Sequence, residues 1–205
     1  MAEPSDNATF WASDFGDQYL ERQVTPAILA ANLNFFARAL ATAGPLTSIL
    51  ELGANAGQNL YGLRRLYPNT QLTGVEINAR ACEMLQRVEG VEVKNQSLLD
   101  FEPTTQFDLV ITKTVLIHIA PADLLRAYDI LHRATRRYLL IAEYYSPRPE
   151  MVEYRGHRDR LFKRDFAGEL LEVYPDLAVR DYGFVYRRDK HPQDDVTWFL
   201  LEKNA

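Results

Sequence analysis

A short glycine-containing segment between two apolar stretches constrains this chain more than any other part of its sequence. Glu51-Leu52-Gly53-Ala54-Asn55-Ala56-Gly57 follows an apolar run at 48–50 and precedes a helix-like segment. Glycine lets the backbone approach a ligand because it has no Cβ, and the first amides of a helix have no partner within it. A second acid, Glu76, ends the next apolar stretch about 20 residues later, the separation at which an acid binds ribose hydroxyls in nucleotide-binding folds. The segment therefore predicts a nucleoside-binding α/β fold.

Length and composition indicate one ordinary globular domain. At 205 residues, with 47% hydrophobic and 25% charged residues, the chain is long enough to bury a complete core. We expect a single domain over 1–205, with a helical, lid-like N-terminal segment over 1–44 and a Rossmann-like core over 45–205. A net charge of −5 does not favour non-specific attraction to nucleic acid or to an anionic membrane.

Localisation signals are lacking in the sequence. The first residues have neither a basic region nor an apolar region of the kind found in signal peptides. No apolar stretch is long enough to cross a bilayer. The single cysteine, Cys82, excludes an intrachain disulfide and suits a reducing compartment. We therefore expect a cytoplasmic protein without membrane contact.

The rest of the pattern alternates between strands and helices. The central strand candidates are continuous apolar runs, which is typical of parallel strands covered on both faces. The last two strand candidates have no helix between them, so they can form a hairpin that adds an antiparallel strand. The pattern predicts a doubly wound, seven-stranded α/β sheet, mostly parallel with one antiparallel strand near the C-terminus and helices on both faces. The predicted strands are 48–52, 71–76, 91–95, 107–111, 138–143, 177–186 and 196–201, and the helices after residue 44 are 58–66, 79–88, 122–134 and 164–174.

The glycine-containing segment resembles the first motif of the class I S-adenosylmethionine-dependent methyltransferases. That motif is an acid followed by small residues at alternate positions, here Glu51, Gly53, Asn55 and Gly57. Asn55 replaces the usual middle glycine, and asparagine tolerates left-handed backbone conformations better than most residues. A nicotinamide dehydrogenase would need a third glycine or alanine where Gln58 stands. The resemblance implies S-adenosylmethionine as cofactor and S-adenosylhomocysteine as product.

The resemblance also implies which residues contact the cofactor. Glu76 would accept hydrogen bonds from the ribose hydroxyls, and Ser97 and Leu98 would contact the adenine. Separately from the resemblance, the N-terminal segment can fold over the cofactor as a lid, so that Tyr19 and Arg22 reach the cofactor carboxylate. The alternative is a peripheral helix that uses its aromatic side chains for packing. The complete set of expected cofactor-binding residues is Glu51, Gly53, Asn55, Gly57, Glu76, Ile77, Ser97, Leu98, Thr112, Tyr19 and Arg22.

Methyl transfer from a sulfonium needs mainly proximity and alignment, because the leaving group is already good. A base is needed only where the acceptor must lose a proton before attack. The catalytic candidates are His118, Lys113 and Tyr144, all near the carboxyl edge of the predicted sheet. His118 has a second interpretation, as a packed residue that bonds a backbone carbonyl.

A basic run follows the fifth predicted strand and is a candidate acceptor site. Five Lys or Arg residues fall between 155 and 164, with tyrosines beside them. Guanidinium groups suit carboxylates and phosphates, so a small anionic acceptor would fit. The alternative is a solvated loop with internal ion pairs. The expected substrate-binding residues are Tyr145, Tyr154, Arg155, His157, Arg158 and Arg160.

Nearly the whole chain resembles a narrower group, the small methylases associated with pseudaminic acid biosynthesis clusters. Phe15-Gly16-Asp17, the run 154–169 and the string 181–186 carry this resemblance. It implies a small sugar acid or similar compound as the acceptor.

The sequence therefore favours a small-molecule methyltransferase that acts on an oxygen or nitrogen atom. A sensor or partner subunit that binds S-adenosylmethionine without catalysis is the alternative. A nucleic-acid methyltransferase is disfavoured, because Thr112-Lys113-Thr114-Val115 stands where an Asn/Asp-Pro-Pro-Tyr motif would grip a flipped base. No cluster of histidine and acidic residues has metal-ligand spacing, so no metal is expected.

Overall fold

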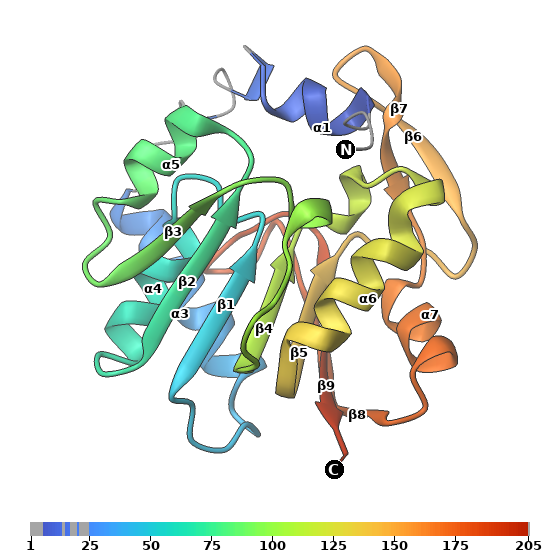
Figure 1. Cartoon of the computed structure of the whole chain (residues 1–205). Coiled ribbons are helices and arrows are strands. Elements are labelled where there is room, and N and C mark those ends of the chain that lie inside the picture. The colour runs from blue at the N-terminus through green and yellow to red at the C-terminus, as the bar shows by residue number, and fades with distance from the viewer. Residues whose placement is uncertain (1–5, 14, 17–19, 21–24, 205) are drawn as a thin grey trace.

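A seven-stranded sheet forms the centre of the computed structural model, which describes residues 6–13, 15–16, 20 and 25–204 (Figure 1). The strand order is β3-β2-β1-β4-β5-β9-β8. β9 is antiparallel to both β5 and β8, while the other neighbouring strands are parallel. The predicted sheet with one antiparallel strand is confirmed. The strands are β1 (Ser48–Leu52), β2 (Gln71–Glu76), β3 (Val91–Asn95), β4 (Phe107–Lys113), β5 (Thr135–Glu143), β8 (Leu177–Val185) and β9 (Val196–Lys203).

Helices cover both faces of the sheet and bury two apolar clusters. Phe35 and Phe36 of α3, with Leu60 of α4, belong to one cluster, and Tyr128 of α6 and Leu170 of α7 belong to the other. The central strands are buried on both faces, as their continuous apolar sequence predicts. The helices are α1 (Asp6–Trp11), α3 (Pro26–Ala39), α4 (Gln58–Leu66), α5 (Ala79–Leu85), α6 (Leu124–Ala134) and α7 (Phe166–Val173).

The start of α3 follows from its sequence. The Thr25 hydroxyl accepts a hydrogen bond from the Ile28 amide at 3.2 Å, and Pro26 occupies the first helical position. Both features favour a helix start, since they deal with amides that have no partner inside the helix. Thr25 and Pro26 thus define the start of α3, which packs against α4 on one face of the sheet.

A two-stranded hairpin, β6 (Glu150–Tyr154) and β7 (His157–Lys163), was not predicted. The hairpin includes the basic run. The many charged side chains there obscure the alternation of apolar and polar residues that indicates a strand. Arg155 and Gly156 form its turn with positive φ angles of 49° and 85°. Figure 1 shows this hairpin rising beside α1, beyond the carboxyl ends of the parallel strands.

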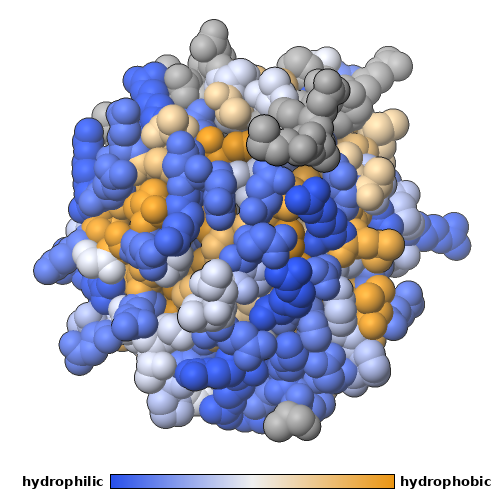
Figure 2. Space-filling view, viewed as in Figure 1, coloured by the Kyte–Doolittle hydropathy of each residue, from blue (hydrophilic) through white to orange (hydrophobic). Residues whose placement is uncertain are grey.

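The carboxyl edge of the sheet faces α1, which lies across the top of the strands in Figure 1. The face of the molecule shown in Figure 2 is largely hydrophilic, with apolar side chains visible between the polar ones. None of the described helices is both long and apolar enough to cross a membrane.

Gly57 and Gly156 offer a matched test of packing in the fold. Both have left-handed backbones, at φ angles of 80° and 85°. A Cβ on Gly57 would lie 2.6 Å from Leu85 Cδ1, whereas a Cβ on Gly156 would meet no atom within 4 Å. Backbone strain is common to both alanine variants, so Gly57→Ala should be more destabilising than Gly156→Ala by about 1–3 kcal/mol, the usual cost of overpacking. Urea unfolding measures this difference, and equal losses would contradict the packing assigned to Gly57.

Candidate functional site

The loop between β1 and α4 has an unusual backbone that its sequence permits. Gly53, Asn55 and Gly57 have φ angles of 80°, 47° and 80°. The amides of Gly53 and Ala54 both donate to the carbonyl of Val75 at 2.9 Å. A Cβ on Gly53 would lie 2.5 Å from Val115 Cγ2. These glycines therefore allow close packing within the protein, and the loop is tied to β2 rather than held open.

Glu76, at the end of β2, is fixed by backbone amides. Its Oε2 accepts from the amide of Asn55 and its Oε1 from the amide of Asn78, each at 2.8 Å. Burial raises the pKa of Glu76, and these amide bonds oppose the rise. The backbone of Ile77 also hydrogen-bonds to this carboxylate. A carboxylate has about four lone-pair positions, so Glu76 keeps capacity for at least one further donor. The arrangement presents an oriented pair of acceptors.

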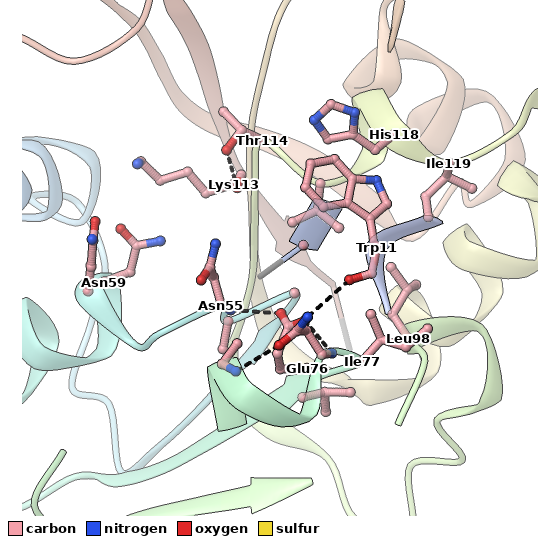
Figure 3. Close-up of a pocket in the computed structure, with 18 of the residues that line it drawn as sticks. Trp11, Asn55, Asn59, Glu76, Ile77, Leu98, Lys113, Thr114, His118 and Ile119 are labelled. Atoms are coloured by element: carbon pink, nitrogen blue, oxygen red, sulfur yellow. Dashed lines mark hydrogen bonds between the residues drawn. The ribbon is translucent and has the colours of Figure 1, made fainter. Parts of the chain in front are cut away.

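These elements line a cavity of about 250 Å³ at the carboxyl edge of the sheet (Figure 3). In Figure 3, Lys113 and Asn59 lie toward one side of the cavity, and Leu98 and Ile119 lie toward the other. The first side is polar and the second apolar. The lining comprises Asn7, Trp11, Gly16, Leu20, Asn32, Gly53, Ala54, Asn55, Gln58, Asn59, Val75, Glu76, Ile77, Asn78, Ala81, Gln96, Ser97, Leu98, Leu99, Lys113, Thr114, Val115, His118, Ile119, Gln193, Asp194 and Val196.

Glu51 lies behind the cavity wall and is almost wholly buried. Its Oε1 accepts from Asn59 Nδ2 at 2.6 Å, whereas Oε2 has no hydrogen-bond partner among the described residues. Burial raises the pKa of Glu51 to about 8, although the bond from Asn59 and the charge of Lys113 lower it. At this pKa the carboxyl is mostly protonated at neutral pH and can both donate and accept. A buried polar atom without a partner costs stability, so a ligand or a water that hydrogen-bonds to Oε2 would stabilise this position.

His118 lies in a short 3₁₀ helix, η2 (Leu116–His118), and is held by its ring. Nδ1 is 2.6 Å from the carbonyl oxygen of Arg160. Because a carbonyl only accepts, Nδ1 must carry the hydrogen in the neutral ring, which leaves the lone pair on Nε2. The ring packs between Trp11, at 4.6 Å between centroids, and Tyr154, at 5.1 Å. Burial lowers the pKa of His118 to about 4, so the ring is neutral at physiological pH.

Glu143, at the end of β5, holds the segment between β4 and η2. Its carboxylate accepts from the Thr112 hydroxyl and from the amides of Val115 and Leu116, each at 3.1 Å. The amide of Ile117 also donates to it, at 3.4 Å. Burial raises the pKa of Glu143 to about 7 against these bonds. This carboxylate fixes the position of the segment that presents Lys113 and His118.

Lys113 brings a positive charge to the polar side of the cavity. Burial lowers its pKa, while Glu51, Asp194 and Glu143 raise it. Its Nζ also lies 5.6 Å from the ring centroid of Phe35. The side chain is therefore a partly desolvated amine close enough to three acidic side chains for them to influence its pKa.

The structure brings together half of the predicted site residues whose side chains it describes, eight of sixteen. Those that line the cavity are Gly53, Asn55, Glu76, Ile77, Ser97, Leu98, Lys113 and His118. Those outside the lining are Glu51, Gly57, Thr112, Tyr144, Tyr145, Tyr154, Arg155 and Arg160. Tyr19 and Arg22 lie outside the described residues, as do the side chains of His157 and Arg158.

The basic run makes most of its described contacts with the protein. Arg160 Nη1 donates to Asn7 Oδ1, and its guanidinium carbon lies 5.0 Å from the ring centroid of Phe10. Arg164 forms an ion pair with Glu169 at 2.6 Å. Arg155 is exposed at the hairpin turn. The run thus supports α1 and η2, and through the Arg160 carbonyl it orients His118.

Sequence reasoning missed several residues that line the cavity. Asn7 and Trp11 of α1 and Asn32 of α3 come from the segment before the core, and Gln193 and Asp194 come from the loop between β8 and β9. Only tertiary packing brings these three regions to one place. The polar side chains of the loop after 186 were the one available signal, because they follow a strand in the predicted hairpin.

Two contacts place α1 across the cavity. Asn7 Nδ2 donates to the carbonyl of His118 at 3.0 Å, and Asn78 Nδ2 donates to the carbonyl of Trp11 at 3.3 Å. One contact is to the segment after β4 and the other to the segment after β2. This short helix therefore bridges the two halves of the site.

Comparison with known proteins agrees with this geometry. Residues 49–137 match the family model described as a methyltransferase domain. With the fold, this match indicates a S-adenosylmethionine-dependent methyltransferase. The predicted enzyme class and cofactor are confirmed. No curated protein sequence matches the chain.

Solved structures of other methyltransferases share the enzyme's fold. The 1,6-didemethyltoxoflavin-N1-methyltransferase of Burkholderia thailandensis is 20% identical, with a TM-score of 0.72 over 100% of this chain and 92% of that one. The magnesium protoporphyrin IX methyltransferase of Synechocystis PCC 6803 is 13% identical, with a TM-score of 0.68 over 100% of both chains. The N-methyltransferase NodS of Bradyrhizobium japonicum WM9 is 16% identical, with a TM-score of 0.65 over 89% of this chain and 100% of that one. At these identities the likeness is one of fold.

Acid should destabilise the enzyme partly through His118. Its pKa is about 4 in the folded state and 6.5 without burial, so the unfolded state binds more protons between these values. The free energy of unfolding should therefore fall as the pH falls from 6.5 to 4, by about 3 kcal/mol from this group.

The comparison variant is His118→Asn, whose amide can still donate to the Arg160 carbonyl. Urea unfolding at several pH values should show a steeper acid loss for the parent than for the variant. Parallel curves would mean that His118 titrates in the folded state as it does in water.

Proposed function

We propose that the enzyme transfers a methyl group to a nitrogen or oxygen atom of a small acceptor bound in the cavity beneath α1. One observation carries this proposal. The same cavity contains the oriented carboxylate oxygens of Glu76 and, at its polar end, the side chain of Lys113. Its described lining is drawn from seven separate parts of the chain, which suits an enclosed small molecule.

The residues fit the cofactor by their own chemistry. Glu76 keeps acceptor capacity for a ribose hydroxyl, and the apolar side chains of Ile77, Leu98 and Ile119 suit the flat faces of an adenine. The buried Oε2 of Glu51 lacks a donor among the described residues, which an ammonium group or a bound water would supply. Ser97 accepts from the Leu99 amide at 3.1 Å, so its hydroxyl still has a hydrogen to donate.

The bound cofactor supplies an electrophilic methyl group on a sulfonium, which leaves as a neutral thioether. The chain's own residues align the reactants and exclude water. Glu76 and the loop at 53–57 would hold the cofactor, while the segment at 113–118, fixed by Glu143, would face the acceptor. The N-terminal segment, with Trp11 in contact with His118, would act as the lid.

The acceptor is proposed to be a sugar acid or an amino-acid-like compound. The resemblance to methylases of pseudaminic acid clusters supports a carboxylated acceptor, and Lys113 is a cation that reaches the cavity. Arg160 and Arg164 are engaged by Asn7 and Glu169, so they support this proposal less than the sequence suggested. Among the structural relatives, some act on small molecules by N-methylation, as their names state.

His118 is poorly suited to act as a base in the cavity, and Lys113 is proposed as a cation rather than as a base. A general base works best with a pKa near the operating pH, and burial leaves His118 with a pKa of about 4. The His118 ring also lies between two aromatic rings, which supports a packing role. Tyr144 donates its hydroxyl to Asp194 Oδ2 at 2.9 Å, so its influence would pass through Asp194.

Calorimetric titration with S-adenosylmethionine and S-adenosylhomocysteine tests the cofactor assignment. Micromolar binding of both by the parent is expected, with none of NAD. Glu76→Ala should lower the affinity at least tenfold, because hydrogen bonds to a charged group contribute about 1.5–3 kcal/mol each. Glu83→Ala, an exposed acid on α5, is the matched control and should bind as the parent does. Unchanged affinity in Glu76→Ala would remove the ribose assignment.

Lys113→Met and His118→Asn separate an acceptor role from a cofactor role. Since both residues are proposed to face the acceptor, both variants should bind S-adenosylhomocysteine within about threefold of the parent (a factor of ten corresponds to about 1.4 kcal/mol). The same titration measures this without any acceptor. A loss in Lys113→Met as large as that in Glu76→Ala would instead assign Lys113 to the carboxylate of the cofactor.

A further inference from the structure

The loop between β8 and β9 supplies the polar end of the cavity with two side chains that the proposed cofactor contacts do not use. Gln193 and Asp194 both line the cavity, next to Asn32 of α3. They belong to a connection at the sheet edge rather than to the loops after β1, β2 or β3. This end of the cavity is therefore available to the acceptor.

A chain of hydrogen bonds fixes which atom Gln193 presents. Asn32 Nδ2 donates to the backbone carbonyl of Gln58 at 3.1 Å, and Gln193 Nε2 donates to Asn32 Oδ1 at 3.1 Å. A backbone carbonyl can only accept, so Asn32 must turn its amide nitrogen toward Gln58 and its oxygen toward Gln193. Gln193 must then use its own nitrogen toward Asn32. Its oxygen is left as the free end of the chain.

That oxygen has no donor in the described protein. Gln193 Oε1 is buried and has no hydrogen-bond partner among the described residues. A buried acceptor without a partner carries a desolvation cost. The chain through Asn32 prevents the side chain from relieving this cost by turning its amide over. Gln193 is thus a rigid acceptor whose partner comes from outside the described protein.

The charges at this end favour the same kind of ligand. Asp194 accepts from the Tyr144 hydroxyl through Oδ2 at 2.9 Å, and a carboxylate has further lone pairs to offer. Asp194 lies near enough to Lys113 to raise its pKa. This end therefore offers the Gln193 oxygen and the Asp194 carboxylate as acceptors, with Lys113 as the cation among the described lining residues.

We propose that Gln193 and Asp194 form a subsite that binds an amino group of the methyl acceptor. This inference rests on the proposed function and narrows it, since a sugar acid or amino-acid-like acceptor would then be one that carries an amine. An ammonium group has three donors and a positive charge, which suit the Gln193 oxygen and the Asp194 carboxylate together. Where this nitrogen is itself methylated, it first gives one proton to Asp194 or to water, and its freed lone pair then forms the bond to the methyl group as the thioether leaves. A hydroxyl group has one donor and no charge, so it satisfies this end less well. Lys113 remains for the acidic group of the same molecule.

Matched pairs of probe compounds test the amine specificity. Each pair shares a carbon skeleton and exchanges an amine for a hydroxyl: β-alanine with 3-hydroxypropionate, glucosamine with glucose, and benzylamine with benzyl alcohol. Release of S-adenosylhomocysteine is measured at saturating S-adenosylmethionine. The amino member of at least one pair should be methylated, and in each active pair it should have the higher kcat/KM. Preference for the hydroxyl member, or no methylation of any amino compound, would overturn the proposal.

Two variants assign the preference to this loop. Gln193→Leu removes the acceptor oxygen, and Asp194→Asn removes the charge while keeping an acceptor for Tyr144. Each should raise KM for the amino compound about tenfold to a hundredfold, the loss of a hydrogen bond to a charged group, with kcat changed less than KM. The control is Gln71→Leu, the same substitution at an exposed position at the opposite end of β2. If Gln193→Leu behaves as Gln71→Leu does, Gln193 does not bind the acceptor.

Cofactor titrations keep this proposal separate from the proposed function. Gln193→Leu and Asp194→Asn should bind S-adenosylhomocysteine as the parent does. Failure of the parent to bind it would refute the proposed function itself. If the parent binds the cofactor normally but does not prefer the amino member of any probe pair, only the amine subsite is refuted.

Discussion

The buried carboxylate of Glu143 organises the reactive edge of this molecule. It accepts hydrogen bonds from Thr112 and from three consecutive amides at 115–117, so the chain leaving β4 is tied to the end of β5. Val115, within that segment, fills the space that a Cβ on Gly53 would occupy. The cofactor loop and the acceptor side of the cavity are therefore positioned by one contact network. A carboxylate with a raised pKa is kept in place because its hydrogen bonds offset much of its desolvation.

Glu76 and Glu143 use the same physical device for different purposes. Each stands at the end of a parallel strand and accepts backbone amides from a neighbouring segment. Glu76 lines the cavity and keeps acceptor capacity toward it, whereas Glu143 is turned into the protein. An acidic residue at the end of a strand lies close to the site. Whether its carboxylate faces a ligand depends on how the neighbouring segment packs around it. Acids at similar places in the pattern thus have different roles.

Most of the fold and about half of the candidate site could be predicted from local sequence patterns. The residues from Glu51 to Glu76 lie on consecutive elements, so their spacing was sufficient to predict the loop, the acid and the strand between them. β9 was predictable because no helix-like segment separates it from β8. The hairpin at 150–163 was not, since alternating charges conceal a strand whose neighbours are unknown from the sequence.

The other half of the site consists of residues that are far apart in the sequence but close together in the fold. The spacing of residues along the chain does not predict such contacts. Asn32, Lys113 and Gln193 belong to a helix, a strand end and a loop that are far apart in the chain. The basic run illustrates the opposite error: its charges suggested a binding surface, yet Arg160 and Arg164 have partners within the protein. Charge composition could not reveal that pairing, because Asn7 and Glu169 reach the run only through tertiary packing.

The position of α1 has a consequence for the kinetics of the enzyme. The helix is bonded to the His118 carbonyl on one bank of the cavity, and its Trp11 carbonyl is bonded by Asn78 on the other. A nucleoside that enters or leaves the cavity on this side must displace at least one of these two hydrogen bonds. Exchange of the spent cofactor for a fresh one by this route would then depend on movement of α1.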